Sequence, residues 1–314
     1  MGPSEVDLLG IRAGAGAGTP GAGEGPRALR ERGLVATLVA AGHDVRDLGD
    51  IPGVYETRFA TGPHGTLHDL ARVLQVNRHT HACVLGTRRR NPASFLLIVG
   101  GDHSLAIGTL AGLSDSCGRL GLLWLDAHAD FNTPASSPSG NIHGMSLAVA
   151  CGRGNRDLRS IGACDPMVLE QDVRLYGVRD LDPGERRALE ASDIRVLSKT
   201  ELLAQGGAAA IVSAAEELAR NCDHVHLSFD IDVVDPPHVR GTGTPVADGL
   251  APELCRAALA GLGRAGVLRS AEIVEYNPTL DADGQTGALV LDLVLALMSR
   301  PGDEPQSEPR QSEP

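Results

Sequence analysis

Short apolar runs alternate with longer amphipathic segments along most of this chain. The runs, which are rich in Leu, Val and Ile, are 95–99, 120–125, 173–178, 225–229 and 271–274. Such near-continuous apolar character is typical of strands that are buried on both faces of a parallel sheet. The intervening patterns predict helices over 26–41, 183–191, 199–220, 252–264 and 284–300. This order predicts an α/β fold, and the pattern alone leaves open whether the sheet is a closed barrel or an open one.

Acidic residues, and in two cases histidines, occur within a few residues of the end of four of these apolar runs. The motifs contain His103, Asp126, His128, Asp130, Asp230, Asp232 and Glu275. The carboxyl ends of parallel strands share one edge of the sheet, where α/β proteins keep their functional sites, so we expect these side chains to meet. A single Asp or His in this position would be an ordinary helix cap or turn residue. Four such motifs at equivalent strand ends favour a functional site instead.

Two of the motifs alternate their polar residues. Asp126, His128 and Asp130 are two residues apart, and so are Asp230 and Asp232. If these residues continue a strand, each motif points its side chains to one side and aims them at one place. Clustered carboxylates repel one another unless cations lie between them. The sequence therefore predicts a metal site, and one that holds two ions.

The overall composition of this 314-residue chain indicates which classes of partner it favours. Its formal net charge of −12 argues against nucleic acid or an anionic membrane as a partner and suits a small cationic substrate. Six cysteines include no Cys-x-x-Cys pair and predict reduced thiols in a cytoplasmic protein. The N-terminus shows no signal-peptide pattern, and the longest apolar run, 288–298, is interrupted by Asp292 and too short to cross a bilayer.

Two segments lack the pattern of a buried element. Residues 10–25 are rich in Gly and Ala and predict a flexible loop, without a convincing dinucleotide-binding fingerprint. Residues 301–314 are rich in Pro, Glu, Ser and Gln and predict a disordered tail, since such a composition cannot bury a core. We expect residues 4–300 to form one domain.

Four motifs in combination resemble the ureohydrolase family of binuclear manganese enzymes, which contains arginases, agmatinases and formimidoylglutamases. They are Gly-Gly-Asp-His-Ser, Asp-Ala-His-Ala-Asp, Ser-Phe-Asp-Ile-Asp-x-x-Asp-Pro and Glu-Ile-Val-Glu-Tyr-Asn-Pro. Residues 130–143 and 177–185 resemble the arginase branch in particular. The resemblance implies a three-layer α/β/α sandwich with a mostly parallel central sheet, and an assembly that is a homotrimer or a homohexamer.

The resemblance also implies which side chains hold the ions. One ion would be bound by His103, Asp126, Asp130 and Asp230, and the other by Asp126, His128, Asp230 and Asp232. Asp126 and Asp230 would bridge the two, because a carboxylate has two oxygens. This oxygen-rich set suits two Mn²⁺ ions, although ligand type alone also admits Co²⁺, Ni²⁺ or Zn²⁺.

The implied reaction is hydrolysis of L-arginine to L-ornithine and urea through a metal-bridging hydroxide. Asp130 would accept the proton of that hydroxide, and His143 would return a proton to the leaving amine. Glu275 would pair with the guanidinium group of the substrate.

Other residues are expected to choose the substrate. By resemblance, neutral donors for the α-carboxylate are Asn132, Ser137, Ser139 and Asn141, while the acids for the α-ammonium are Asp182 and Glu185. By similarity, Thr244 is expected to contact the substrate. Thr244 and Ser228 are also candidates for supporting the metal ligands. Two alternatives remain: a hydrolase of another guanidino compound, such as agmatine or guanidinobutyrate, and a non-catalytic binding protein on the same fold.

Overall fold

The computed structural model describes residues 5–51, 67–300 and 302 of the chain. Within this part, eight strands form one sheet in the order β2-β1-β3-β8-β7-β4-β5-β6. Every neighbouring pair is parallel. The strands are β1 Glu5–Ile11, β2 Asp44–Ile51, β3 Phe95–Gly100, β4 Leu120–Leu125, β5 Val173–Tyr176, β6 Arg195–Leu197, β7 His224–Asp230 and β8 Ser270–Val274.

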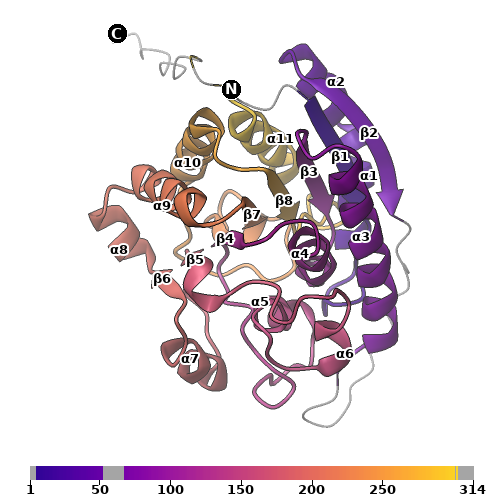
Figure 1. The fold of residues 1–314 in the computed structure, drawn as a ribbon. Coiled ribbons are helices and arrows are strands. Elements are labelled where there is room, and N and C mark those ends of the chain that lie inside the picture. The colour runs from indigo at the N-terminus through magenta and orange to yellow at the C-terminus, as the bar shows by residue number, and fades with distance from the viewer. Residues whose placement is uncertain (1–4, 52–66, 301, 303–314) are drawn as a thin grey trace, which may run out of the picture.

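Helices lie on both sides of this sheet (Figure 1). The α-helices are α1 Gly25–Glu31, α2 Leu34–Ala40, α3 Leu70–Arg90, α4 Ala106–Ser114, α5 Ser146–Ala150, α6 Arg156–Arg159, α7 Pro183–Glu190, α8 Lys199–Ala204, α9 Ala208–Asn221, α10 Pro252–Ala265 and α11 Gln285–Leu297. Short 3₁₀ helices are η1 Ala22–Glu24, η2 His103–Leu105, η3 His143–Met145, η4 Glu170–Asp172 and η5 Ile231–Val233.

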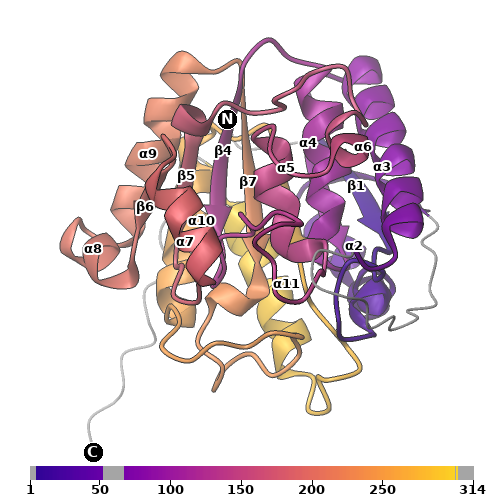
Figure 2. The same cartoon turned by 90° about the horizontal axis from the view of Figure 1, so that it is seen from below.

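Two apolar cores fill the space between the sheet and its helices. In β3, Leu97 and Val99 belong to one core and Leu96 and Ile98 to the other, because side chains alternate along a strand. Helices α1, α2, α9, α10 and α11 pack on the first core, and α3 to α7 on the second (Figures 1 and 2). The predicted three-layer α/β/α sandwich is confirmed, and the sheet is open rather than a closed barrel.

All five predicted strands are present, with ends shifted by at most two residues, but the sequence pattern missed β1, β2 and β6. Strands β2 and β6 are the two edges of the sheet. Most side chains of β2 are exposed or half-buried, so it carries no apolar run. Edge strands face water and commonly bear charged residues, which explains why β2 and β6 were missed, whereas β1 is internal and buried.

Glycines break two of the predicted helices. The segment 26–41 forms α1 and α2, separated at Gly33, whose φ is 91°. The segment 199–220 forms α8 and α9, separated at Gly206 and Gly207, with φ of 101° and 60°. Positive φ is incompatible with a right-handed helix and is readily adopted by glycine.

The predictions for residues 10–25 and 301–314 have different outcomes. The predicted loop over residues 10–25 begins inside β1 and includes η1, so only its middle is irregular. The predicted tail lies outside the described residues, apart from Gly302. Among the helices that the structure describes, none has the length and apolar character needed to cross a membrane.

The four strands that precede the polar motifs are direct neighbours. Strands β3, β8, β7 and β4 occupy consecutive positions in the middle of the sheet. Since all four are parallel, the loops that leave their carboxyl ends emerge at one edge. The predicted convergence of the motifs at this edge is therefore a property of the topology.

Candidate metal centre

Most of the acidic and histidine side chains lie in the loops that follow the strands rather than in the strands themselves. β4 ends at Leu125, before Asp126, and β7 ends at Asp230, with Asp232 already in η5. The expectation that these residues continue a strand is therefore correct for Asp230 and wrong for the others, although they do come together. Local hydrogen bonds shape the loops instead: Asp126 Oδ1 accepts from the His128 backbone N–H at 2.7 Å, and Asp230 Oδ1 accepts from that of Asp232 at 2.8 Å.

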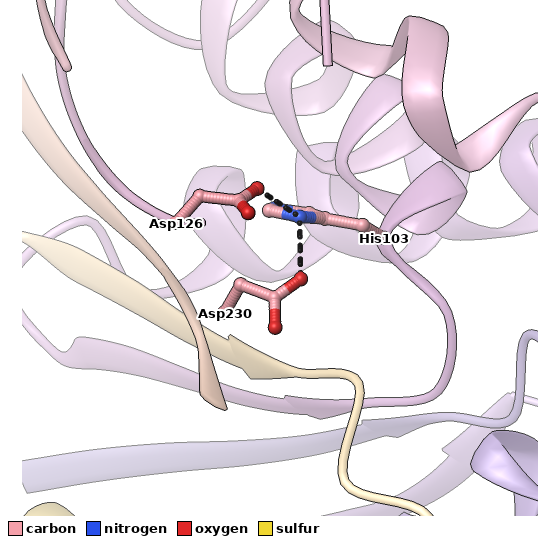
Figure 3. Close-up of side chains that lie close together, drawn as sticks. All are labelled: His103, Asp126 and Asp230. Carbon is pink, nitrogen blue, oxygen red and sulfur yellow. Dashed lines mark ion pairs between the residues drawn. The ribbon is translucent and has the colours of Figure 1, made fainter. Parts of the chain in front are cut away.

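The imidazole of His103 lies at the centre of three carboxylates. Its Nδ1 is 3.2 Å from one Oδ2 atom each of Asp126, Asp130 and Asp230. Figure 3 shows the side chains of Asp126 and Asp230 converging on this ring. Nδ1 is fully buried and has no hydrogen-bond partner among the described residues. Together, the buried imidazole nitrogen and the three carboxylate oxygens form a suitable set of donors for a divalent cation.

A second cluster adjoins the first. His128 Nδ1 is 3.1 Å from Asp232 Oδ2 and 3.4 Å from Asp126 Oδ1. Two sets of candidate metal ligands result, His103 with Asp126 and Asp230, and Asp126 with His128 and Asp232, each with its donor atoms within 4.8 Å of one another. Asp126 belongs to both, with one oxygen toward each histidine. The residues thus fit a pair of neighbouring cations.

Without cations, the charges of this cluster are poorly balanced. Burial and the nearby Asp126 carboxylate raise the pKa of Asp130 well above its usual range. Burial and Asp232 do the same to the pKa of Asp230. Crowded, desolvated carboxylates hold protons because their ionised forms repel one another. Divalent ions would replace those protons and stabilise the ionised forms.

Residues behind His103 fix the orientation of its ring. His103 Nε2 is 2.8 Å from Ser228 Oγ, which donates to Glu272 Oε1 at 2.8 Å. Trp124 stacks on the imidazole with ring centroids 4.1 Å apart. Such contacts orient a metal-binding histidine so that its other nitrogen faces the ion.

The partly buried His143 and the buried Glu275 form a pair beside the centre. His143 Nδ1 is 3.0 Å from Glu275 Oε1, which also accepts the His103 backbone N–H at 2.8 Å. Burial favours neutral imidazole, but the hydrogen bond and the charge of Glu275 outweigh it and raise the pKa of His143 to about 9. A histidine in this state carries a proton at neutral pH.

The centre opens into a cavity of about 130 Å³. Its lining residues are His128, Asp130, Asn132, Ser137, Ser139, His143, Gly144, Asp180, Asp182, Glu185, Asp230 and Thr244. The lining includes metal-ligand candidates as well as the hydroxyl and amide groups expected to contact a substrate. Thr244 donates from Oγ1 to Asp232 Oδ2 at 3.2 Å, which links the lining to the second cluster.

The proposed substrate residues are not equivalent in their surroundings. Asn132 Nδ2 donates to Asp182 Oδ2 at 3.0 Å, so an amide and an acid stand side by side on the cavity wall. Both oxygens of Glu185 already accept backbone N–H groups, at 2.8 Å from Phe131 and 3.3 Å from Asp182. Asn141 is partly exposed and lies outside the lining described above, as does the buried Glu275.

Two of the candidate catalytic residues have strained backbones. Asp130 has a φ of 50° and Glu275 a φ of 63°, in the left-handed region that non-glycine residues seldom adopt. Such strain persists only where the surrounding structure enforces it, and it concentrates at functional sites. The sequence gives no direct signal of this conformation.

Sequence reasoning missed two residues of the site. Trp124 stacks on His103 and also donates from Nε1 to Asp126 Oδ2 at 3.0 Å. As the single tryptophan of the chain, two residues before Asp126, it could have been noticed. Asp180 lines the cavity and precedes Asp182 by two residues, so its spacing was a signal too.

Comparison with known proteins gives a consistent result. The arginase family profile matches residues 4–299. Arginase from Bacillus subtilis (strain 168) is 38% identical over 295 residues, which cover 94% of this chain and 98% of that protein. The native structure of Bacillus caldovelox arginase has 37% identity and a TM-score of 0.88, covering 95% of this chain and 98% of the other. Entamoeba histolytica arginase in complex with L-ornithine has 32% identity and a TM-score of 0.86, with 95% and 99% covered.

Proposed function

This chain belongs to the arginase family, and from that premise we propose that it hydrolyses L-arginine to L-ornithine and urea with two manganese ions. One observation carries the proposal: two sets of metal ligands share Asp126 and adjoin a cavity lined by further acids and hydroxyls. The carboxylate-rich donor set supports a hard ion such as Mn²⁺, with His103 and His128 as the nitrogen ligands.

The ligand assignment follows the two clusters. His103, Asp126, Asp130 and Asp230 are proposed to hold one ion, and Asp126, His128, Asp230 and Asp232 the other. When bound, two such cations act as Lewis acids and lower the pKa of a coordinated water, which the poorly electrophilic guanidinium carbon requires. The protein supplies the fixed geometry, because backbone N–H groups hold Asp126 and Asp230 in place.

Proton transfers are assigned to two residues that line the cavity. Asp130, whose Oδ2 belongs to the first cluster, accepts the proton released by the attacking water on its other carboxylate oxygen. His143 Nδ1 is engaged by Glu275, so Nε2 is the nitrogen that delivers a proton to the leaving amine. The carboxylate of Glu275 keeps this imidazole protonated, and its negative charge attracts the guanidinium of the substrate.

The opposite wall of the cavity is proposed to hold the amino-acid end of arginine. Asp182 receives the α-ammonium, while the α-carboxylate takes hydrogen bonds from donors on the loop 132–141. The donors are Asn132, Ser137, Ser139 and Asn141, with Thr244 as a further contact. Glu185 is part of the same lining and supports it, since its carboxylate holds the backbones of Phe131 and Asp182.

Urea release across a substrate panel tests this function. The chain is loaded separately with Mn²⁺, Co²⁺, Ni²⁺ or Zn²⁺, its metal content is measured, and urea is quantified from arginine, agmatine and guanidinobutyrate. Arginine with Mn²⁺ is expected to give the highest kcat/KM. A preference for agmatine or guanidinobutyrate would establish the other guanidino hydrolase, and fully loaded protein without any turnover would indicate a binding protein. Light scattering on the same samples tests the proposed homotrimer or homohexamer.

A further inference from the structure

The glycine-rich residues 13–20, here called the strap, cross the loop that carries His143. The strap is fixed at both ends. Near its start, the Ala13 carbonyl accepts the backbone N–H of Asp102 at 3.1 Å. At its other end, the Pro20 carbonyl accepts Asn277 Nδ2 at 2.8 Å. The strap therefore spans from the loop after β3 to the loop after β8, the two loops that carry His103 and Glu275.

The middle of the strap contacts the active-site loop through Gly16. The Gly16 backbone N–H donates to Asp102 Oδ2 at 2.9 Å, and the Gly16 carbonyl accepts the His143 backbone N–H at 3.1 Å. Asp102 is fully buried, and its other oxygen accepts the Ser104 N–H at 2.9 Å. A buried carboxylate with both oxygens engaged is a rigid anchor for the peptide group that holds His143.

Different groups hold the main chain and the ring of His143, and Ser146 Oγ also donates to its carbonyl at 2.9 Å. The strap holds its main chain, and Glu275 Oε1 holds its ring at 3.0 Å. Glu275 Oε1 is itself fixed by the His103 backbone N–H at 2.8 Å, and His103 follows Asp102 directly. The hydrogen bonds therefore close a ring that runs from Asp102 through the strap, His143 and Glu275 back to the loop after β3.

We propose that Gly16 and Asp102 are positioning residues that hold His143 at the distance and angle needed for proton transfer. The inference rests on the proposed role of His143 as the proton donor. Transfer requires close alignment, and a displacement of about 1 Å costs on the order of 100-fold in rate. Without the strap, the His143 main chain would keep the contacts of Ser146 at its carbonyl, but its N–H would lose the acceptor that fixes the start of the side chain.

The packing around Gly16 shows why this position lacks a side chain. A Cβ built there would lie 2.6 Å from both Ser104 Cβ and Asp102 Oδ1 and would also overlap Ser104 Oγ. Ser104 and Asp102 are buried, so the strap must move away to admit a methyl group. Gly14, two residues earlier, has its nearest neighbour at 3.7 Å and would accept a methyl group without displacement.

Gly16→Ala and Gly14→Ala form a matched pair for the experiment. Both are made in the full chain loaded with manganese, alone and combined with His143→Ala. Asp102→Asn is a second test variant of nearly equal volume. Its single amide oxygen can accept from either the Gly16 N–H or the Ser104 N–H, whereas the carboxylate accepts from both. Metal content, kcat and KM for arginine, and hydrogen exchange of the peptide containing His143 are measured for each.

Gly16→Ala and Asp102→Asn are expected to lower kcat by about 10- to 100-fold, with KM and metal content within about twofold of the original protein. The His143 amide should exchange at least about tenfold faster, because its acceptor has moved. Gly14→Ala should change none of these quantities. In the His143→Ala background, Gly16→Ala should cause no further loss of kcat, since the residue being positioned is already absent.

Two results would overturn the inference. The first is a kcat that is unchanged in both Gly16→Ala and Asp102→Asn, whether or not the His143 amide exchanges faster. The other is a loss in the His143→Ala background equal to that in the original protein, which would mean general damage rather than positioning. Failure of the proposed function is separately visible as absence of urea from the unsubstituted protein. In that event, hydrogen exchange still decides whether Gly16 holds His143, because it needs no turnover.

Discussion

The indole ring of Trp124 lies flat against the imidazole of His103, with centroids 4.1 Å apart and planes 9° from parallel. The same indole donates from Nε1 to Asp126 Oδ2 at 3.0 Å. One side chain from the end of β4 therefore orients two ligands of the first cluster.

Trp124→Phe should weaken metal binding while leaving the fold intact. Phenylalanine keeps an aromatic face against His103 but loses the hydrogen bond to Asp126, and loss of such a supporting contact weakens metal affinity by about 10- to 100-fold. Isothermal titration of the metal-free protein with Mn²⁺ measures the change. An affinity equal to that of the original protein would show that the indole N–H does not orient Asp126.

Asp126→Asn should abolish binding of both ions. Asp126 is common to both sets of ligands, and an amide is a weaker ligand than a carboxylate and carries no charge. Metal content after loading and desalting should fall from two ions per chain to below one. Asp232→Asn is the matched comparison, because Asp232 belongs to the second set alone, and it should retain one ion. Full occupancy in Asp126→Asn would refute its bridging role.

Asp182→Ala should reduce activity toward arginine selectively. A hydrogen bond to a charged group contributes about 1.5–3 kcal/mol, which corresponds to roughly 10- to 150-fold in kcat/KM. Guanidinobutyrate has no amino group, so its turnover, however slow, should be unaffected. Steady-state kinetics with both compounds provide the comparison. Equal losses for the two substrates would mean that Asp182 supports the cavity wall, through Asn132, rather than the α-ammonium.

Glu185 should make the metal-free protein less stable as the pH rises from about 5 to 8. Burial raises the pKa of Glu185 from 4.5 to about 7, so between these values the folded state binds more protons than the unfolded state. Stability contributed by this proton is therefore present at low pH and lost as the pH rises through 7. Glu185→Gln does not titrate and should lose less stability over this range.

Urea denaturation at pH 5, 6, 7 and 8 measures the free energy of unfolding of the original protein and of Glu185→Gln, both with metal removed by a chelator. The slope of that free energy against pH is then compared between the two proteins. The glutamine variant is expected to be less stable at low pH, since its amide cannot accept both backbone N–H groups that the carboxyl oxygens accept. The difference in slope is the diagnostic quantity. Identical pH dependence in the two proteins would show that Glu185 does not hold its proton in the folded state.

Local sequence pattern was sufficient to predict the buried middle of the fold. Strand β4 has the same bounds as the predicted run, because six consecutive apolar residues leave no other way to bury both faces. Helix α3 was missed although it is 21 residues long, since polar and basic residues interrupt its apolar face. Its buried side includes Asn77 and Thr80, so burial there does not follow hydrophobicity.

The chemistry of the site was predictable to a similar extent. Acidic residues after buried strands indicated one shared edge, and the structure places His103, Asp126 and Asp230 together there. Alternation along a strand does not explain the convergence of Asp126 and Asp130, because both lie in a loop after β4 that hydrogen bonds shape. Asp130 and Glu275, both in the left-handed region, are hydrogen-bonded through their main chains to Ala148 and Gly101, which are distant in the sequence.

The sequence by itself determined which groups this protein can bring to its site, because residue type sets charge, ligand preference and the capacity to exchange protons. Only the tertiary structure decided which of these groups touch. Gly16 lies 86 residues from Asp102 and Asn132 lies 50 residues from Asp182, yet each pair is hydrogen-bonded. Such contacts depend on the order of strands in the sheet and on the paths of loops, which local periodicity does not encode.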